Sequence, residues 1–279
     1  MAKTLQIRIA ERVVRRGFKK TALLRNINFD LHSGELVMIL GGSGAGKTTF
    51  LNAVMGYEKA KGQIIYGGLD LYRDYEMVRH EIGYVPQQDL LRLKDNVLDT
   101  LLNAAEMRMP VAVGPEERFR RAVAVLARLG LEREMDQQVI KLSGGQRKRL
   151  SIAVELISDP GLFFLDEPDS GLDGIMARSL HTVLRGIADQ GKIVVTITHA
   201  PDRVAELYDK VVVLAKSRLD NCGTLVFYGS PAQAFDFFET NSLEGVVRRV
   251  NRQDEGGDGL ADEYILCYAA GKTMGMAWS

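Results

Sequence analysis

The sequence of 279 residues has few cysteines, no excess charge of either sign and no long apolar run. Its two cysteines, Cys222 and Cys267, stand far apart and in no metal-binding spacing, which argues against a disulfide scaffold and favours free thiols in a reducing compartment. Lysine plus arginine and aspartate plus glutamate both number 36. This balance gives no sign of the basic face of a nucleic-acid-binding protein.

Membrane-spanning and secretory patterns are also missing from the sequence. No stretch approaches the ~18 apolar residues of a membrane span, and the first residues lack the apolar run of a signal peptide. The apolar runs that do occur, such as 36–40 and 193–197, are short and include β-branched residues, which is typical of buried parallel strands. We therefore expect a soluble, cytoplasmic chain.

The order of strand-like and helix-like segments predicts an α/β domain. Alternating residues at 5–14 and 22–31 predict an antiparallel edge sheet. Further strands are expected at 36–40, 62–66, 82–85, 162–165, 193–197 and 211–214. Helices are expected at 47–55, 174–190, 202–208 and 231–239.

Two segments differ in composition from this pattern. Between residues 88 and 157, leucine, alanine, arginine and glutamate dominate, with helical spacing at 95–109 and 115–130, which predicts a helical subdomain inserted into the core. Beyond residue 240 the sequence becomes polar and rich in glycine and aspartate. We expect residues 1–240 to form the domain, and residues 241–279 to be a weakly structured C-terminal extension or linker.

A glycine-rich segment, the phosphate loop, follows the strand expected at 36–40 and precedes a helix. It reads Gly41, Gly42, Ser43, Gly44, Ala45, Gly46, Lys47 and Thr48, and Thr49 comes next. Its glycines let several backbone N–H groups converge on phosphate oxygens, and the following helix adds its dipole. Lys47 is expected to contact the β- and γ-phosphates, and the Thr48 hydroxyl to ligate Mg²⁺. The sequence therefore predicts an ATP site.

Two acids, Asp166 and Glu167, follow the apolar run at 162–165. Open α/β sheets bind their ligands at the carboxyl ends of strands. We expect Asp166 to hold Mg²⁺, directly or through water, and Glu167 to act as the general base on the attacking water. Alone, two acids after a strand are weak evidence, because acids often begin solvent-exposed loops. A phosphate loop upstream favours the catalytic interpretation.

A second glycine turn, the signature segment at 142–146, opens another helix with Ser143 as its N-cap. Here the chain, over about residues 5–240, resembles the nucleotide-binding domain of the ATP-binding cassette (ABC) family. The family's signature motif is matched at every position by Leu142, Ser143, Gly144, Gly145 and Gln146. Gln87 stands at the Q-loop glutamine, 170–173 at the D-loop and His199 at the switch histidine. The motifs occur in the family's order.

The resemblance implies a P-loop NTPase (RecA-like) α/β core with an antiparallel β edge sheet and an inserted α-helical subdomain. It also implies an ATPase in which two such domains, identical or different, bury ATP between them. The signature residues would contact the nucleotide bound by the partner, and Asp173 would bridge the two domains. Gln87 would touch Mg²⁺ or water, and His199 would hold the γ-phosphate, so that both would join Glu167 as catalytic residues.

Finer features at 44–49, 147–156 and 227–231 look like the G (white/pigment-precursor) subfamily and its bacterial relatives. The resemblance implies the ATPase subunit or domain of a transporter, with export as the favoured direction. Its partner would be a transmembrane permease, fused or separate, which would place the chain at the cytoplasmic side of a membrane. Residues 88–109, which follow Gln87, are the expected contact surface for that partner.

Two other interpretations stay open. The alternative is a soluble ABC ATPase that acts on nucleic acid or ribosomes, but such proteins usually carry two cassettes, a coiled-coil insertion or a basic face, and this sequence shows none of these. A small-molecule phosphoryl-transfer enzyme is a third class, and it would not need residues 142–146. Demand for an acceptor substrate in ATP turnover would indicate this third class.

The sequence departs from the family pattern in two places. Asp169 stands where the family usually has threonine, and it adds a second acid near Glu167, with like-charge repulsion as the expected result. The family's adenine-stacking aromatic residue is not evident upstream of the phosphate loop. Phe18 is the only aromatic residue between residues 1 and 28, and Val13 or Val14 is the other candidate for the position.

Overall fold

The computed structural model describes residues 3–17 and 19–272 of the chain. Its strands are β1 (Thr4–Arg16), β2 (Lys19–His32), β3 (Leu36–Leu40), β4 (Lys61–Tyr66), β5 (Leu69–Asp70), β6 (Ile82–Val85), β7 (Leu162–Asp166), β8 (Ile193–Ile197), β9 (Lys210–Lys216) and β10 (Gly223–Gly229). The α-helices are α1 (Lys47–Val54), α2 (Tyr75–Val78), α3 (Val97–Arg108), α4 (Pro115–Arg128), α5 (Gly144–Leu156), α6 (Gly174–Ala188), α7 (Pro231–Phe238), α8 (Leu243–Val250) and α9 (Ala261–Ala269).

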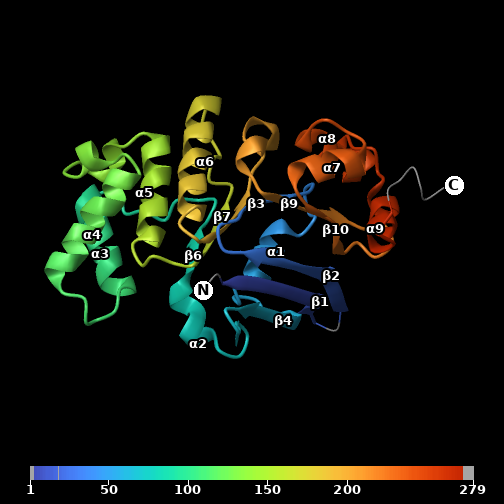
Figure 1. The fold of residues 1–279 in the computed structure, drawn as a ribbon, viewed down its shortest axis with the longest axis horizontal. Helices are drawn as coiled ribbons and strands as arrows, with labels where there is room; N and C mark the ends of the chain where they lie inside the picture. Colours follow the sequence, from blue (N-terminus) through green and yellow to red (C-terminus); the bar gives the residue numbers. More distant parts are fainter. Residues whose placement is uncertain (1–2, 18, 273–279) are drawn as a thin grey trace.

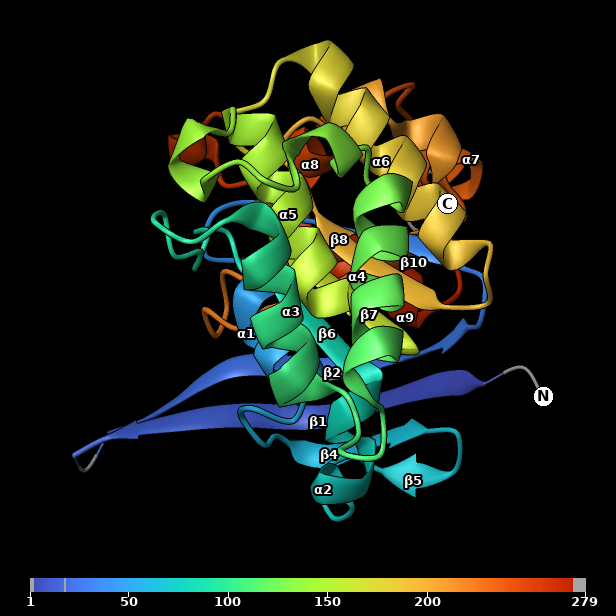
Figure 2. The same cartoon turned by 90° about the vertical axis from the view of Figure 1, so that its left-hand side faces the viewer.

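Over the described residues the strands form one mixed 10-stranded sheet in the order β5-β4-β1-β2-β10-β9-β3-β8-β7-β6. Strands β9, β3, β8, β7 and β6 form a parallel run, whereas β10 pairs antiparallel with β9 and parallel with β2. Strands β1, β2, β4 and β5 pair antiparallel, as the edge-sheet prediction requires. Figure 2 shows β1 and β2 as a long hairpin beneath the stacked helices.

Strand β3 lies between two hydrophobic cores because successive side chains of a strand point to opposite faces. Leu36, Met38 and Leu40 join the core that packs under the helices α3 to α9. Val37 and Ile39 join the second core, which α1 and the antiparallel strands enclose. All five residues of β3 are buried, which confirms the prediction of a fully buried strand.

The helices expected at 95–109 and 115–130 are confirmed as α3 and α4. Together with α5 they form a helical lobe at the β6 end of the sheet (Figure 1), where Leu101, Ala105, Leu126 and Ile152 are fully buried. Every helix in the described part of the chain is too short or too polar to cross a bilayer.

The prediction of a helix at 202–208 is wrong. Two short 3-10 turns, Pro201–Arg203 and Ala205–Leu207, stand there instead. Val204 between them has φ of −134°, outside the helical region, so continuous i to i−4 hydrogen bonding is interrupted. The expected list of strands also missed β5 and β10.

The expectation that residues 241–279 are weakly structured is wrong for the part that the structure describes; residues 273–279 lie outside it. Helices α8 and α9 pack on the core and bury Leu243, Val246 and Tyr264. The carboxylate of Asp202 caps α8 by accepting hydrogen bonds from the N–H groups of Leu243 and Glu244. Figure 1 shows these helices beside α7, at the end of the molecule opposite the helical lobe.

Close packing, and not flexibility, explains Gly257 in this segment. The Gly259 N–H donates to the Asn251 carbonyl at 2.8 Å, which folds the chain back on itself. A Cβ added to Gly257 would lie 2.3 Å from the Asn251 carbonyl oxygen. A Cβ added to Gly42 of the phosphate loop would lie 2.0 Å from Asn251 Oδ1. The C-terminal segment is therefore fitted against the phosphate loop.

We predict that Gly257→Ala lowers the free energy of unfolding by about 1–3 kcal/mol, because the added methyl group overpacks a close backbone contact. Gly186→Ala is the matched control, since Gly186 is exposed within α6 and a Cβ there meets no atom within 4 Å. That control is expected to be neutral or to stabilise by up to ~1 kcal/mol. Urea unfolding of both variants measures the difference, and equal effects would contradict the packing argument.

Candidate nucleotide site

The candidate site lies at the carboxyl ends of four adjacent parallel strands. The phosphate loop follows β3, His199 comes after β8, Glu167 follows β7, and Gln87 comes after β6. The register places Ile39 opposite Ile197, and Asp166 opposite Ile197 on the other side of β8. Parallel pairing therefore gathers four loops, distant in sequence, at one edge of the sheet.

The phosphate loop adopts backbone conformations that require glycine. Gly41 has φ of +147° and Gly46 has φ of +91°. A Cβ on Gly41 would also lie 2.2 Å from the Leu214 carbonyl oxygen. The Lys47 ammonium donates to the Gly41 carbonyl at 2.7 Å and to the Gly42 carbonyl at 3.1 Å. This lysine is thereby held across the loop that is predicted to receive the phosphates.

The other predicted loop residues differ in exposure. Ser43 and Gly44 are exposed at the loop tip, whereas Ala45 is buried and its N–H donates to the Gly42 carbonyl at 3.2 Å. Thr49 is half-buried in the first turn of α1. The exposed tip leaves its backbone accessible to a ligand.

Thr48 and Asp166 bring two oxygen donors together. The Thr48 hydroxyl donates to Asp166 Oδ2 at 3.0 Å, although the two residues are far apart in sequence. Burial raises the pKa of the Asp166 carboxyl above its ordinary value, and the charge of Glu167 raises it further, against the lowering effects of Thr48 and Lys47. A hard cation prefers such oxygen ligands, so these residues fit a magnesium site.

Glu167 stands at the centre of the site and is held from several sides. Its N–H donates to the Ile197 carbonyl at 3.1 Å, and its φ of +52° is a left-handed conformation, unusual for glutamate. Gln87 Nε2 donates to Glu167 Oε2 at 2.5 Å, and His199 Nε2 lies 2.5 Å from Glu167 Oε1. Such backbone strain costs about 1–3 kcal/mol and clusters at functional sites.

The signature segment lies elsewhere in the domain. Ser143 caps α5, accepting from the Gln146 N–H at 3.2 Å while Gln146 Oε1 accepts from the Ser143 N–H at 2.9 Å. Ser143 and Gly144 are exposed. Among the described residues, no hydrogen bond or ion pair joins the signature segment to the phosphate loop, and α5 stands with the helical lobe (Figure 1). The predicted site residues therefore fall into two separate groups.

Asp173 belongs to the second group. Its Oδ1 accepts from the N–H groups of Ile175 and Met176 and caps α6. The start of α6 lies beside the signature segment, and a groove of about 220 Å³ between them is lined by Ser143, Gly145 and Met176. The D-loop and the signature segment thus share one surface of the domain.

Lys148 contacts the Q-loop next to the candidate site, a contact that the sequence reasoning missed. Only 4% of it is exposed, and its ammonium donates to the Gln87 carbonyl at 2.9 Å and lies 3.0 Å from Asp89 Oδ1. Ser151 also donates to Asp89, at 2.9 Å. The sequence held one signal for this burial: Lys148 lies four residues before the apolar Ile152, and residues at this spacing share one face of a helix. Lys148 ties the signature helix to the Q-loop.

The structure bears on the two departures from the family pattern, Asp169 and the adenine-stacking residue. The Asp169 carboxylate turns inward to Thr198 and His181, whereas the Glu167 carboxylate contacts Gln87 and His199. The two carboxylates therefore have different partners, and no direct contact between them supports the expected like-charge repulsion. Phe18 lies outside the described residues, and Val13 and Val14 are half-buried near the end of β1, so the adenine-stacking residue stays a prediction.

Comparison with known proteins decides the family. A family model described as ABC transporter matches residues 24–170, more than half of the chain. The chain belongs to the ABC transporter family. The recognition made from the motifs is confirmed, and this ABC domain is an ATP-binding cassette, the ATPase part of such proteins.

Over the aligned regions, more than a third of the residues are identical between this ABC domain and two curated relatives. It is 38% identical over 212 residues to an ABC transporter ATP-binding/permease protein of Mycobacterium tuberculosis, covering 76% of this chain and 24% of that protein. It is 36% identical over 227 residues to ABC transporter G family member 22 of Arabidopsis thaliana, covering 78% of this chain and 29% of that protein. The ABC domain thus spans roughly a quarter of the length of these relatives.

Solved structures confirm the expected fold. A dimeric ATP-binding cassette in a post-hydrolysis state, bound to ADP and Pi, superposes with a TM-score of 0.69 at 26% identity, covering 81% of this chain and 98% of that one. The cbiO1 protein of Clostridium perfringens, part of the cbiONQ ABC transporter complex, gives a TM-score of 0.70 at 27% identity, covering 83% and 90%.

We predict that ATP binding by this ABC domain weakens as pH rises, beginning below the ordinary range of lysine. Burial lowers the pKa of Lys47, against the opposing charges of Glu167 and Asp166. Only the ammonium form attracts phosphate, so affinity is full below the lowered pKa of the free protein and falls above it. Calorimetric titration with ATP between about pH 7 and 10 measures this, because the whole range lies below the ordinary lysine pKa near 10.4, where an unperturbed lysine would stay largely charged.

Lys47→Arg is the control for this pH dependence, because arginine stays charged throughout the range. Lys47→Ala is expected to weaken binding about 10- to 100-fold at neutral pH, the equivalent of one charge-assisted hydrogen bond. If the native domain and Lys47→Arg lose affinity in parallel, Lys47 is not the titrating group.

Proposed function

We propose that this ABC domain hydrolyses MgATP at the edge formed by β3, β8, β7 and β6, and that the reaction powers transport through a membrane-spanning partner. The observation that carries the proposal is the setting of Glu167. Its carboxylate is positioned by Gln87 and His199, beside the convergent Thr48 and Asp166 oxygens and the Lys47 ammonium. A base, a cation ligand set and a phosphate-binding loop are thus in contact with one another.

Thr48 and Asp166 would hold Mg²⁺, with Gln87 as the further ligand, and the metal would stabilise negative charge on the phosphates. The residues of the phosphate loop from Gly41 to Gly46 would present N–H groups to the phosphates. Lys47 would leave its loop carbonyl partners to neutralise the terminal phosphates. This division of roles is the one that the sequence pattern predicts.

Glu167 would accept a proton from the attacking water. Both of its carboxylate oxygens have a protein partner, so movement of either partner would change which lone pairs are open to that proton. Gln87 is exposed and belongs to the loop that leads into the helical lobe. His199 would stay beside Glu167 and contact the γ-phosphate. Movement of Gln87 would thereby link the chemistry to the neighbouring lobe.

The active unit would contain two ATPase domains. In one copy the signature segment lies apart from the phosphate loop, and its Ser143 and Gly144 are exposed. A second domain, identical or different, would place its own signature segment over this nucleotide, with Asp173 at the contact between the two. The dimeric form named for the related ADP- and Pi-bound cassette supports this arrangement.

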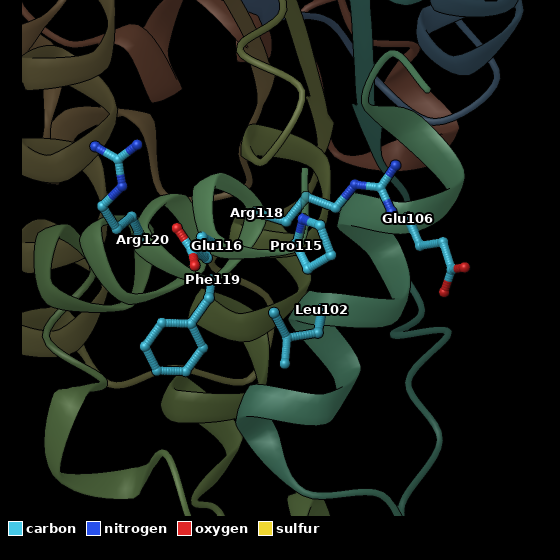
Figure 3. A pocket seen from close by; sticks show the side chains of 7 residues that line it. All are labelled: Leu102, Glu106, Pro115, Glu116, Arg118, Phe119 and Arg120. Carbon is cyan, nitrogen blue, oxygen red and sulfur yellow. The ribbon is translucent and has the colours of Figure 1, made fainter. Parts of the chain in front are cut away.

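The membrane partner would dock on the helical lobe, on the surface that follows Gln87. A groove of about 270 Å³ there is lined by residues that include Leu91, Ala104 and Val154, and Leu90 and Met107 at its edge are 84% and 86% exposed. A larger hollow of about 740 Å³ lies on the other flank of α3, where Leu102 and Phe119 face it (Figure 3). Exposed apolar side chains around grooves are typical of interaction surfaces.

A permease as the partner is supported by the relatives. One is named an ATP-binding/permease protein, and cbiO1 belongs to a transporter complex. The domain would then lie at the cytoplasmic side of a membrane, with helices α8 and α9 packed on the ATPase core. Export as the direction stays a prediction from the G-subfamily resemblance. The soluble alternative, acting on nucleic acid or ribosomes, lacks comparable support.

We predict that Glu167→Gln binds ATP, loses at least ~100-fold in turnover, as expected when a general base is removed, and accumulates as a dimer with ATP. Phosphate release and size-exclusion chromatography measure these outcomes. Glu76→Gln, at an exposed position in α2, is the control and should turn over normally. Normal turnover in Glu167→Gln would refute the base assignment.

We predict that Met107→Glu weakens association with the membrane partner about tenfold or more, because a charge would enter an apolar contact. Basal ATP turnover should stay within twofold of the native domain. Met77→Glu is the control, since Met77 is also an exposed methionine, at 68%, but lies on α2. Co-purification with the permease in detergent checks this, and equal retention of both variants would rule out this docking surface.

A further inference from the structure

A buried polar cluster lies behind the nucleotide site, and none of its members is assigned a role above. It consists of Asp169 after β7, His181 on α6, Thr196 and Thr198 on and after β8, and Tyr208. Each of them is at least nine-tenths buried, and His181 and Thr196 are fully buried. Polar groups in such a position are costly unless they satisfy one another.

The cluster forms one connected chain of contacts. The Tyr208 hydroxyl lies 2.6 Å from His181 Nδ1 and 2.7 Å from the Thr196 hydroxyl. His181 Nε2 lies 3.4 Å from Asp169 Oδ2, without close hydrogen-bond geometry. The Thr198 hydroxyl donates to Asp169 Oδ2 at 2.5 Å. Asp169 is therefore the point where α6 and the end of β8 meet.

Asp169 stays ionised in this environment. Burial raises the pKa of its carboxyl, but the contacts with His181 and Thr198 outweigh burial and hold the pKa below its ordinary value. A threonine here, as the ABC resemblance leads one to expect, would need no such partners. In this chain the buried His181 thus helps to stabilise the ionised form of Asp169.

The position of these contacts relates them to the reacting groups. Asp169 lies two residues after Glu167, and Thr198 directly precedes His199. Each of the two loops forms a tight turn. The Ser170 N–H donates to the Glu167 carbonyl at 3.1 Å, and the Ala200 N–H donates to the Thr198 hydroxyl at 3.2 Å. One hydrogen bond thus ties the loop that carries the base to the loop that carries the histidine facing it.

We propose that Asp169 and Thr198 are positioning residues that set Glu167 against His199, with His181 as the buried partner of Asp169. The inference rests on the proposed role of Glu167 as the base. The left-handed φ of Glu167 is maintained only if surrounding contacts over-determine it, and the bond between Asp169 and Thr198 is such a contact. Loss of this bond would displace the two side chains without removing either.

Thr198→Val tests the proposal because valine keeps the shape of threonine and removes the hydroxyl. We expect kcat for ATP hydrolysis to fall about tenfold or more, since small misplacements of reacting groups are costly, while KM for ATP changes less than twofold. Thr198→Ser restores the hydroxyl and is expected to return kcat to within about threefold of the native value. A role in stability alone would not give this split between kcat and KM.

Thr196→Val is the matched control. It also removes a buried threonine hydroxyl, but one on β8, at the Tyr208 end of the cluster and away from Asp169. Its thermal stability is expected to fall as in Thr198→Val, with kcat within twofold of the native value. Equal losses of kcat in both variants, or an unchanged kcat in Thr198→Val, would overturn the proposal.

A second measurement does not depend on turnover. The chain has four histidines, so the imidazole NMR signals of His199 and His181 can be assigned by substitution. Thr198→Val is expected to shift the His199 signals, and Thr196→Val to leave them in place. If the native domain failed to hydrolyse ATP, the proposed function would fail, and the NMR result would still test the positioning. Unchanged His199 signals in Thr198→Val would reject it.

Discussion

Parallel pairing of β3, β8, β7 and β6 is the constraint on which the nucleotide site depends. Because all four strands run in one direction, the loops that follow them emerge at one edge of the sheet. Buried strands such as β3 and β7 expose no residue to water, so slippage of the register would bury polar loop residues and expose apolar ones. The hydrophobic cores thus fix the distances between the loops that carry the predicted catalytic side chains.

Parts of this architecture could be predicted because their signals are local. The phosphate loop needs glycine at fixed positions, and fully apolar runs such as 36–40 and 162–165 are recognisable without knowledge of their neighbours. The Gly- and Asp-rich segment near 254–259 gave the wrong signal, because composition does not reveal that Gly257 is needed for a close contact with Asn251. Flexibility and tight packing require the same residue there.

The support of the site could not be predicted, since it consists of pairs that are distant in sequence. Lys148 looks like one of several basic residues on a solvent-exposed helix until Gln87 and Asp89 are seen beside it. Asp169 looks like a neighbour of Glu167 until its contacts with Thr198 and His181 are seen. In each case the charge is buried and satisfied by a residue more than ten positions away. One sequence alone contains no pairing information of this kind.

The buried ammonium of Lys148 has a mechanical consequence for the assembled machine. Separating the buried Lys148 ammonium from its partners would be strongly penalised, so we expect the Q-loop and α5 to move together. A push on the lobe from the membrane side would reach Gln87 at one end of this unit and Ser143 at the other. In the proposed dimer, the same movement would therefore affect both the hydrolysis residues of this domain and the signature segment that faces the nucleotide of its partner.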